Sequence, residues 1–121
     1  MALNPNCSLI AVVGGKGGVG KSVFAANVTA AMTAELRVPV LLIDCDTKSV
    51  GDQNIITGLK PVKTLRELAN STTTLASTPL NQLVVQHPSG FSYLGAVRGP
   101  DEILSINSEN LSKIIEFFSR T

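Results

Sequence analysis

The sequence predicts an α/β fold in which helices flank a parallel sheet. Two short runs, at residues 8–13 and 38–44, have the length and apolar character of buried strands. Between them, residues 21–36 carry apolar side chains at helical spacing. A strand, a helix and a second strand in this order form a right-handed crossover, which places the two strands parallel in one sheet.

The composition is that of a small globular chain. Of the 121 residues, 44% are hydrophobic and 16% are charged, and 10 Lys and Arg against 9 Asp and Glu leave a net charge of +1. This balance argues against a nucleic-acid arm or a polybasic membrane surface, so no direct nucleic-acid partner is expected. We find no apolar run long enough to span a bilayer and no signal peptide. Because Cys7 and Cys45 make no disulfide framework, a cytoplasmic protein is expected.

The first half of the chain predicts two strands and a helix. Residues 8–13 end at glycines and are expected to form a buried strand. The following helix is expected to pack through a stripe at i, i+4 spacing, formed by Phe24, Val28, Met32 and Leu36. Residues 38–44 are expected to form a second buried strand, with Pro39 at its start, where a missing N–H does least harm.

The second half is less regular. Thr64 and Glu67 form a capping box that opens a short helix. Prolines and a glycine limit any element within residues 71–90, and residues 91–97 predict a third strand. A last helix follows a cap at Asn107 or Ser108, and its apolar face is formed by Leu111, Ile114, Ile115 and Phe118.

No strand follows this helix, although an open parallel sheet places a strand after each crossover helix. We therefore expect residues 1–121 to be a single domain that is the N-terminal half of a larger one. A compact three-strand domain that ends in a helix is the alternative.

A glycine-rich stretch, residues 14–22, lies between the first expected strand and the first expected helix and reads GGKGGVGKS. It matches the phosphate-loop pattern G-x-x-x-x-G-K-[ST]. Its glycines let successive N–H groups surround phosphate oxygens, and the helix directs its positive end at the same anion. Lys21 adds a full charge, and the Ser22 hydroxyl can bind Mg²⁺. The expected nucleotide-binding residues are Gly15, Lys16, Gly17, Gly18, Val19, Gly20, Lys21 and Ser22.

The same glycines also satisfy the dinucleotide fingerprint G-x-G-x-x-G, and Asp44 lies near the place of a ribose-binding acid. A nicotinamide site does not require the amine of Lys21 and the hydroxyl of Ser22 at these positions. The motif therefore favours a P-loop NTPase-like fold over a dinucleotide-binding oxidoreductase or a purely structural turn.

With Lys16 included, the loop resembles the deviant Walker A motif of the ParA/MinD family of ATPases, which carries a second, signature lysine. The resemblance continues in LLIDCD, at residues 41–46, where family members end a strand with two aspartates. It implies ATP and Mg²⁺ as cofactors and a homodimer formed through ATP. In that dimer Lys16 reaches the nucleotide of the other subunit, and Asp46 orients the attacking water. Ser22 and Asp44 hold the Mg²⁺, and the implied catalytic residues are Lys16, Lys21 and Asp46.

Within this family, the middle of the chain resembles the CpaE/TadZ branch, which serves the assembly of tight-adherence pili. The stretches that match in order and spacing are CDTKSVGDQN, TLRELAN and LNQLVVQHPSGFSYLGAVRGPDEI. The resemblance implies a slowly hydrolysing ATPase, used as a dimerisation switch that positions a pilus-assembly machine through its other protein components. Such a protein is cytoplasmic and is recruited to the inner membrane or cell pole. Partition or division-site ATPases, and a non-hydrolysing ATP-dependent scaffold, are the alternatives.

The chain departs from the family at several positions. Val23 stands where many relatives have a second hydroxyl that contacts the α-phosphate, and Lys48 and Val50 replace a glutamine and a phenylalanine common in the pilus branch. Family members carry a Walker B aspartate and adenine-binding segments later in the chain, and these 121 residues do not include them.

Other polar residues are expected to be structural or solvated. Asp52 lies in a turn that either borders the nucleotide site or is an ordinary turn. Cys45 is expected to be a small core residue. His87 has no acidic or cysteine neighbours at ligand spacing and is not expected to bind a metal, and Arg98 is expected in a solvated loop.

Overall fold

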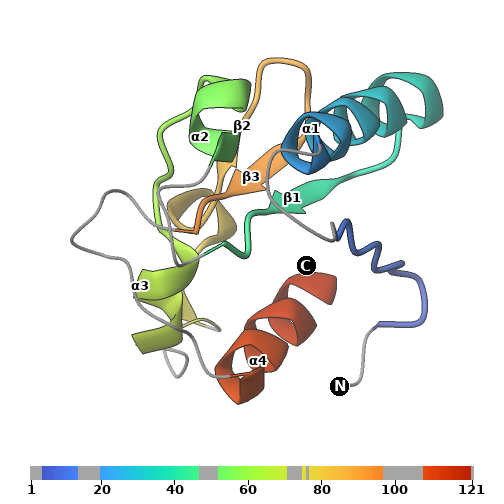
Figure 1. The fold of residues 1–121 in the computed structure, drawn as a ribbon. Coiled ribbons are helices and arrows are strands. Elements are labelled where there is room, and N and C mark those ends of the chain that lie inside the picture. Colours follow the sequence, from blue (N-terminus) through green and yellow to red (C-terminus); the bar gives the residue numbers. More distant parts are fainter. Residues whose placement is uncertain are drawn as a thin grey trace.

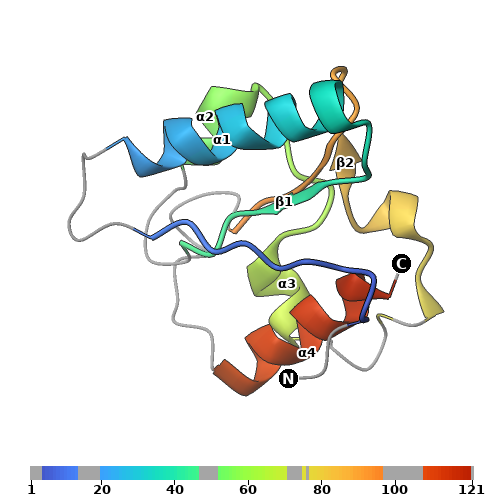
Figure 2. The ribbon, with the colours of Figure 1, turned by 90° about the vertical axis from the view of Figure 1, so that its right-hand side faces the viewer.

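Helices cover both faces of a small sheet in the computed structural model, which describes residues 4–13, 20–46, 52–70, 75, 77–96 and 108–120. One face carries α1 (Lys21–Ala31) and α2 (Asp52–Thr57), and the other carries α3 (Leu65–Asn70) and α4 (Ser108–Ser119) (Figure 1). The side view shows the same three layers (Figure 2). The α/β fold expected from the sequence is therefore confirmed.

The sheet has three strands in the order β1-β3-β2. β1 (Leu41–Ile43) pairs in parallel with β3 (Ser92–Leu94), and β2 (Val85–Gln86) pairs antiparallel with the other edge of β3. The Ser92 N–H donates to the Val40 carbonyl oxygen (2.9 Å), which extends the parallel pair by one residue. The second and third predicted strands are thus parallel neighbours, whereas the short edge strand β2 was not predicted.

The core lies between the sheet and the layer formed by α3 and α4. Leu94 of β3 and Ile114 of α4 are completely buried, and Leu65, Leu83 and Phe118 pack into the same cluster. The apolar face predicted for the last helix is therefore confirmed as its packing face.

The capping box predicted for α3 is also confirmed. The Glu67 N–H donates to Thr64 Oγ1 (3.2 Å), and the Thr64 N–H donates to Glu67 Oε1 (3.2 Å). A parallel bridge between Thr64 and Gly95 places this helix start beside the end of β3. The reciprocal bonds satisfy backbone groups that a helix N-terminus otherwise leaves unpaired.

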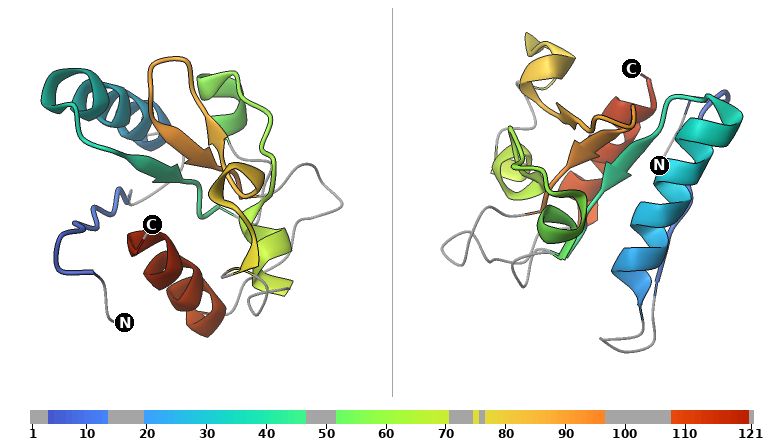
Figure 3. Two further views of the ribbon diagram at one scale, coloured as in Figure 1. Left: turned by 180° about the vertical axis from the view of Figure 1, so that it is seen from behind. Right: turned by 90° about the horizontal axis from the view of Figure 1, so that it is seen from above.

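The first predicted strand is wrong. Residues 8–13, here called the apolar segment, are not in a strand, and Leu9, Ile10 and Val13 are 50%, 62% and 86% exposed. The segment runs past the β1 edge of the sheet (Figures 1 and 3). Within the described part of the chain β1 pairs with β3 alone, so the apolar segment forms no strand pair with the free edge of β1. The observed parallel pair therefore joins β1 to β3 rather than to residues 8–13.

The packing face predicted for α1 is also wrong. Two members of the predicted stripe, Phe24 and Leu36, are 60% and 63% exposed, whereas Ala26 and Thr29 are buried. The reason is close approach, because α1 packs against α2 and β1 through its small side chains. Phe24 and Leu36 are left on the outer side, whereas the other two members of the predicted stripe, Val28 and Met32, are half-buried. A π-helical turn, η1 (Met32–Leu36), extends the helix.

Candidate functional site

The start of α1 and the carboxyl end of β1 lie at the same end of the molecule (Figure 2). Gly20 precedes the helix with φ 80° and ψ 13°, a left-handed conformation that favours glycine. No side chain of the described residues caps this helix start. The N–H groups of its first turn are therefore available to an anion, which the positive end of the helix also attracts.

Two of the expected nucleotide-binding side chains stand in this first turn. Lys21 is exposed and Ser22 is half-buried. The remaining expected residues of the phosphate loop, Gly15, Lys16, Gly17, Gly18 and Val19, lie outside the described residues. The structure therefore places the amine, the hydroxyl and the helix end of the expected site, but not its glycine loop.

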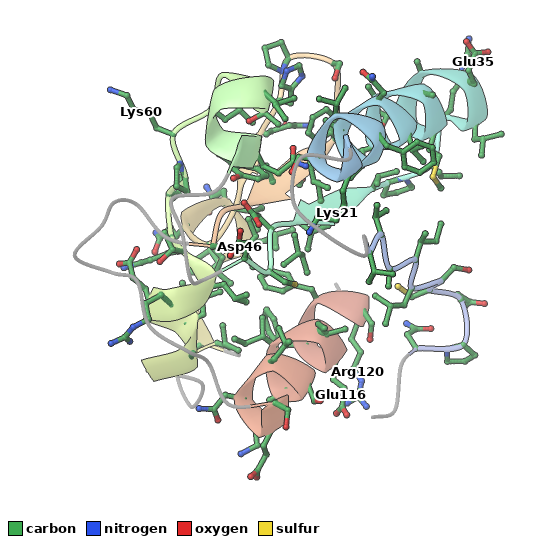
Figure 4. The ribbon with its side chains drawn as sticks, in the orientation of Figure 1. Lys21, Glu35, Asp46, Lys60, Glu116 and Arg120 are labelled. Carbon is green, nitrogen blue, oxygen red and sulfur yellow. The ribbon has the colours of Figure 1, made fainter. Side chains whose placement is uncertain are left out.

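Asp44 and Asp46 follow directly after β1. The Asp44 N–H donates to the Leu94 carbonyl oxygen (3.0 Å), which holds this residue in register with β3. The Asp46 N–H donates to Asp44 Oδ1 (3.0 Å), and Asp46 itself is exposed. In Figure 4, Lys21 lies at the start of α1 and Asp46 lies past the end of β1. The acidic pair is thus at the same end of the sheet as the helix start.

Cys45, between the two aspartates, was predicted to be a core residue, and that prediction is wrong because the side chain is exposed. The pKa of its thiol is nevertheless raised, first because nearby protein atoms desolvate it and second because the Asp44 carboxylate is close. A raised thiol pKa means less thiolate at neutral pH, so Cys45 is not an activated nucleophile.

Tyr93 of β3 is a functional neighbour that the sequence did not indicate. It is fully buried and is paired in register with Leu42. Burial raises the pKa of its hydroxyl, and the nearby Asp44 carboxylate raises it further. Tyr93 therefore lies beneath the acidic end of β1 as a neutral hydroxyl.

Gln53 of α2 is a second residue that sequence reasoning missed. Its side chain is 5% exposed, and its Nε2 donates to the Ser22 carbonyl oxygen (2.8 Å). Nothing in the sequence indicated this contact, because a glutamine after a Gly-Asp turn is normally solvated. Asp52 begins α2, but its side chain lies outside the described residues.

A hollow of about 430 Å³ lies beside Lys21. Its walls are mostly apolar and are formed by Ile10, Ala11, Val12, Val13, Gly20, Lys21 and Phe24. This hollow joins the apolar segment to the exposed side of α1. Among the described residues that line this hollow, Lys21 alone has a charged side chain.

The oxygen atoms at this end of the sheet suit a hard cation. Ser22 and Asp44 offer a hydroxyl and a carboxylate, which are ligand types that Mg²⁺ prefers. Across the described ranges, no cluster of three or more His, Cys, Asp or Glu side chains could hold a metal ion unaided. Mg²⁺ typically binds through one or two protein ligands together with substrate phosphates. Ser22 and Asp44 are therefore suited to hold a Mg²⁺ ion that arrives bound to a nucleotide.

The fold and this site define a nucleotide-binding domain of the P-loop type. Residues 10–121 match the family model described as the CobQ/CobB/MinD/ParA nucleotide binding domain. The chain belongs to this family.

Two known proteins illustrate the relationship. The antiactivator FleN of Pseudomonas aeruginosa is 29% identical over 111 residues, which cover 92% of this chain and 37% of FleN. The crystal structure of a ParA family ATPase from Chlorobium tepidum superposes with a TM-score of 0.61 at 21% identity. That match covers 87% of this chain and 43% of the ATPase. The chain thus spans about two fifths of the length of each relative.

Among the residues that the structure describes, no helix is both long and apolar enough to cross a membrane.

Proposed function

We propose that this chain binds ATP with Mg²⁺ at residues 14–22 and hydrolyses it slowly, as a switch between monomer and dimer. The observation that carries the proposal is the first turn of α1. It presents Lys21 and Ser22 behind the left-handed Gly20, at the end of the sheet where β1 ends in Asp44 and Asp46. Membership of a nucleotide-binding family supports the same ligand class and argues against a dinucleotide-binding oxidoreductase. The same match, which runs from residue 10 to residue 121, supports our proposal that these residues belong to one domain.

Each residue has a separate role in this proposal. The loop amides and Lys21 hold the β- and γ-phosphates, and Ser22 and Asp44 hold the Mg²⁺, which when bound offsets phosphate charge. Asp46 orients a water in line with the γ-phosphate. Lys16 contacts the nucleotide of the other subunit in a dimer, so that dimerisation depends on ATP. Val23 provides no hydroxyl for the α-phosphate.

The setting that we propose is the positioning of a pilus-assembly machine, in the cytoplasm and at the inner membrane or cell pole. The resemblance of stretches within residues 45–103 to the CpaE/TadZ branch supports it. A second candidate is favoured by the FleN relationship. In that case the chain binds a regulatory protein in an ATP-dependent manner, as a partition-type or positioning ATPase or as a scaffold that does not turn ATP over.

Two measurements on the purified protein test the proposal. Titration with ATP and with NAD, each with Mg²⁺, is expected to show binding of ATP alone. Phosphate release is expected to be slow and to require Mg²⁺. Binding of NAD in preference to ATP would contradict the proposed ligand. ATP binding and dimerisation without any phosphate release would support the scaffold in place of the hydrolysing switch.

A further inference from the structure

Gln53 connects α2 to the first turn of α1. Its Nε2 donates to the Ser22 carbonyl oxygen (2.8 Å) across 31 residues of sequence, and its side chain is 95% buried. The backbone of Gln53 is held in turn, because Thr57 Oγ1 donates to its carbonyl oxygen (2.6 Å). A carbonyl oxygen has two lone pairs, so Ser22 can accept this bond as well as the bond within its own helix.

The other half of the Gln53 amide has no partner among the described residues. Its Oε1 is fully buried, and no donor of the described residues reaches it. A buried amide oxygen without a donor is destabilising, and such atoms are rare in folded proteins. Leucine or methionine would fill this position without that cost, so the amide requires an explanation.

We infer that Gln53 is a positioning residue for Ser22, an inference that rests on the proposed function. Nε2 fixes the first turn of α1, and Oε1 accepts the proton of the Ser22 hydroxyl when the hydroxyl oxygen is a ligand of Mg²⁺. A hydroxyl that gives a lone pair to a cation directs its O–H elsewhere and becomes a stronger donor, so it requires an acceptor. The half-buried Ser22 limits access of water to that proton, and Gln53 is already bonded to the same residue.

The test compares nucleotide affinity with Mg²⁺ and with a chelator, in the intact protein and in two variants. Gln53→Met keeps the volume and removes both polar atoms, and Gln82→Met makes the same change at an exposed site in η3 (Leu80–Gln82). We expect Gln53→Met to reduce the gain in affinity given by Mg²⁺ by about tenfold. Its affinity in chelator and its melting temperature without nucleotide should not fall, because the unpaired oxygen is gone. Gln82→Met should match the wild type throughout.

Three results would overturn the inference. A lower melting temperature with an unchanged Mg²⁺ gain would make Gln53 a structural residue only. If Gln53→Met, when added to Ser22→Ala, reduces the Mg²⁺-dependent gain in nucleotide affinity further, Gln53 does not act through the Ser22 hydroxyl. If the wild-type protein binds ATP equally well with and without Mg²⁺, the inference about Gln53 has no basis. If the wild type binds no ATP at all, the proposed function itself is contradicted.

A second variant covers the case in which Gln53→Met does not fold. Gln53→Glu keeps an acceptor oxygen, so it should retain the Mg²⁺ gain. Its added negative charge lies near the site proposed for the phosphates, so it should bind nucleotide less well in chelator. Loss of the Mg²⁺ gain in Gln53→Glu would contradict the role assigned to Oε1.

Discussion

The backbone N–H of Asp44 donates to the carbonyl oxygen of Leu94 at 3.0 Å. This bond continues the pairing of β1 with β3 one residue past the end of β1, so it places the start of the acidic pair. Leu94 is completely buried in the core, so Asp44 is bonded to a residue that is fixed by core packing. The candidate site is therefore built on the sheet itself, as sites in parallel α/β folds generally are.

Lys21 is predicted to bind the phosphates. Lys21→Ala should weaken ATP binding by about tenfold or more, because it removes a charge-assisted contact from a partly desolvated anion site. Calorimetric titration measures the effect. Lys60→Ala is the matched control, because Lys60 is exposed and projects away from the molecule in Figure 4. Unchanged ATP affinity in Lys21→Ala would rule out this lysine as a phosphate ligand.

Lys16 is predicted to act between subunits. Lys16→Ala should leave ATP binding to the monomer intact and abolish ATP-dependent dimerisation, because its charge is needed at the other subunit's nucleotide. Sedimentation velocity with and without ATP measures both states. If Lys16→Ala and Lys21→Ala lose ATP binding equally, Lys16 is a local phosphate contact instead.

Tyr93 is predicted to make the protein sensitive to alkali. Its folded-state pKa lies above that of an unfolded tyrosine, about 10, so the folded form keeps the proton more tightly. Its stabilising contribution is therefore complete below about pH 10 and is lost as pH rises through the higher folded pKa. Tyr93 is the single tyrosine of the sequence, so tyrosinate absorbance reports it alone.

We expect that absorbance to rise only together with unfolding in the wild type. Asp44→Asn removes the charge that raises the folded-state pKa of Tyr93 further, so alkali should destabilise this variant less and its unfolding should move to higher pH. Tyr93→Phe has no hydroxyl to ionise at this position, so its stability should fall less steeply than that of the wild type as the pH rises above about 10. Ionisation of Tyr93 in the folded protein near pH 10 would contradict the prediction.

The exposed apolar surface predicts self-association of residues 1–121. Ile10 and Val13 of the apolar segment and Phe24 of α1 adjoin one hollow, and contiguous apolar patches tend to become buried in contacts. Sedimentation equilibrium should show concentration-dependent association that decreases in the variant Ile10→Ser, Phe24→Ser. Leu80→Ser, at an exposed site outside this surface, is the control. A monomer at all concentrations, with cooperative unfolding and measurable ATP hydrolysis, would mean that this surface is tolerated.

The features that were predicted correctly from the sequence are those that depend on residues close together in the chain. The capping box at Thr64 and Glu67 and the face of α4 at Ile114 and Phe118 were predictable because each depends on residues three or four positions apart. Strands near β1 and β3 were predictable from apolar runs of suitable length, but the predicted parallel pair joined residues 38–44 to residues 8–13, whereas β1 pairs with β3.

The remaining features depend on distant neighbours. The apolar segment was predicted to be a buried strand, but it forms no pair with the free edge of β1 and its Ile10 and Val13 side chains are exposed. The packing face of α1 was assigned to Phe24, Val28, Met32 and Leu36, whereas the buried residues of this helix are Ala26 and Thr29. The contact between Gln53 and Ser22 joins two elements whose relative position no sequence spacing specifies.

The most direct test of the account is a structure of the protein with Mg²⁺ and a non-hydrolysable ATP analogue. We predict the β- and γ-phosphates at the amides of residues 17–22, with the Lys21 amine on them and Ser22 and Asp44 beside the Mg²⁺. A nucleotide bound elsewhere, with the loop of residues 14–22 closed on itself, would contradict it.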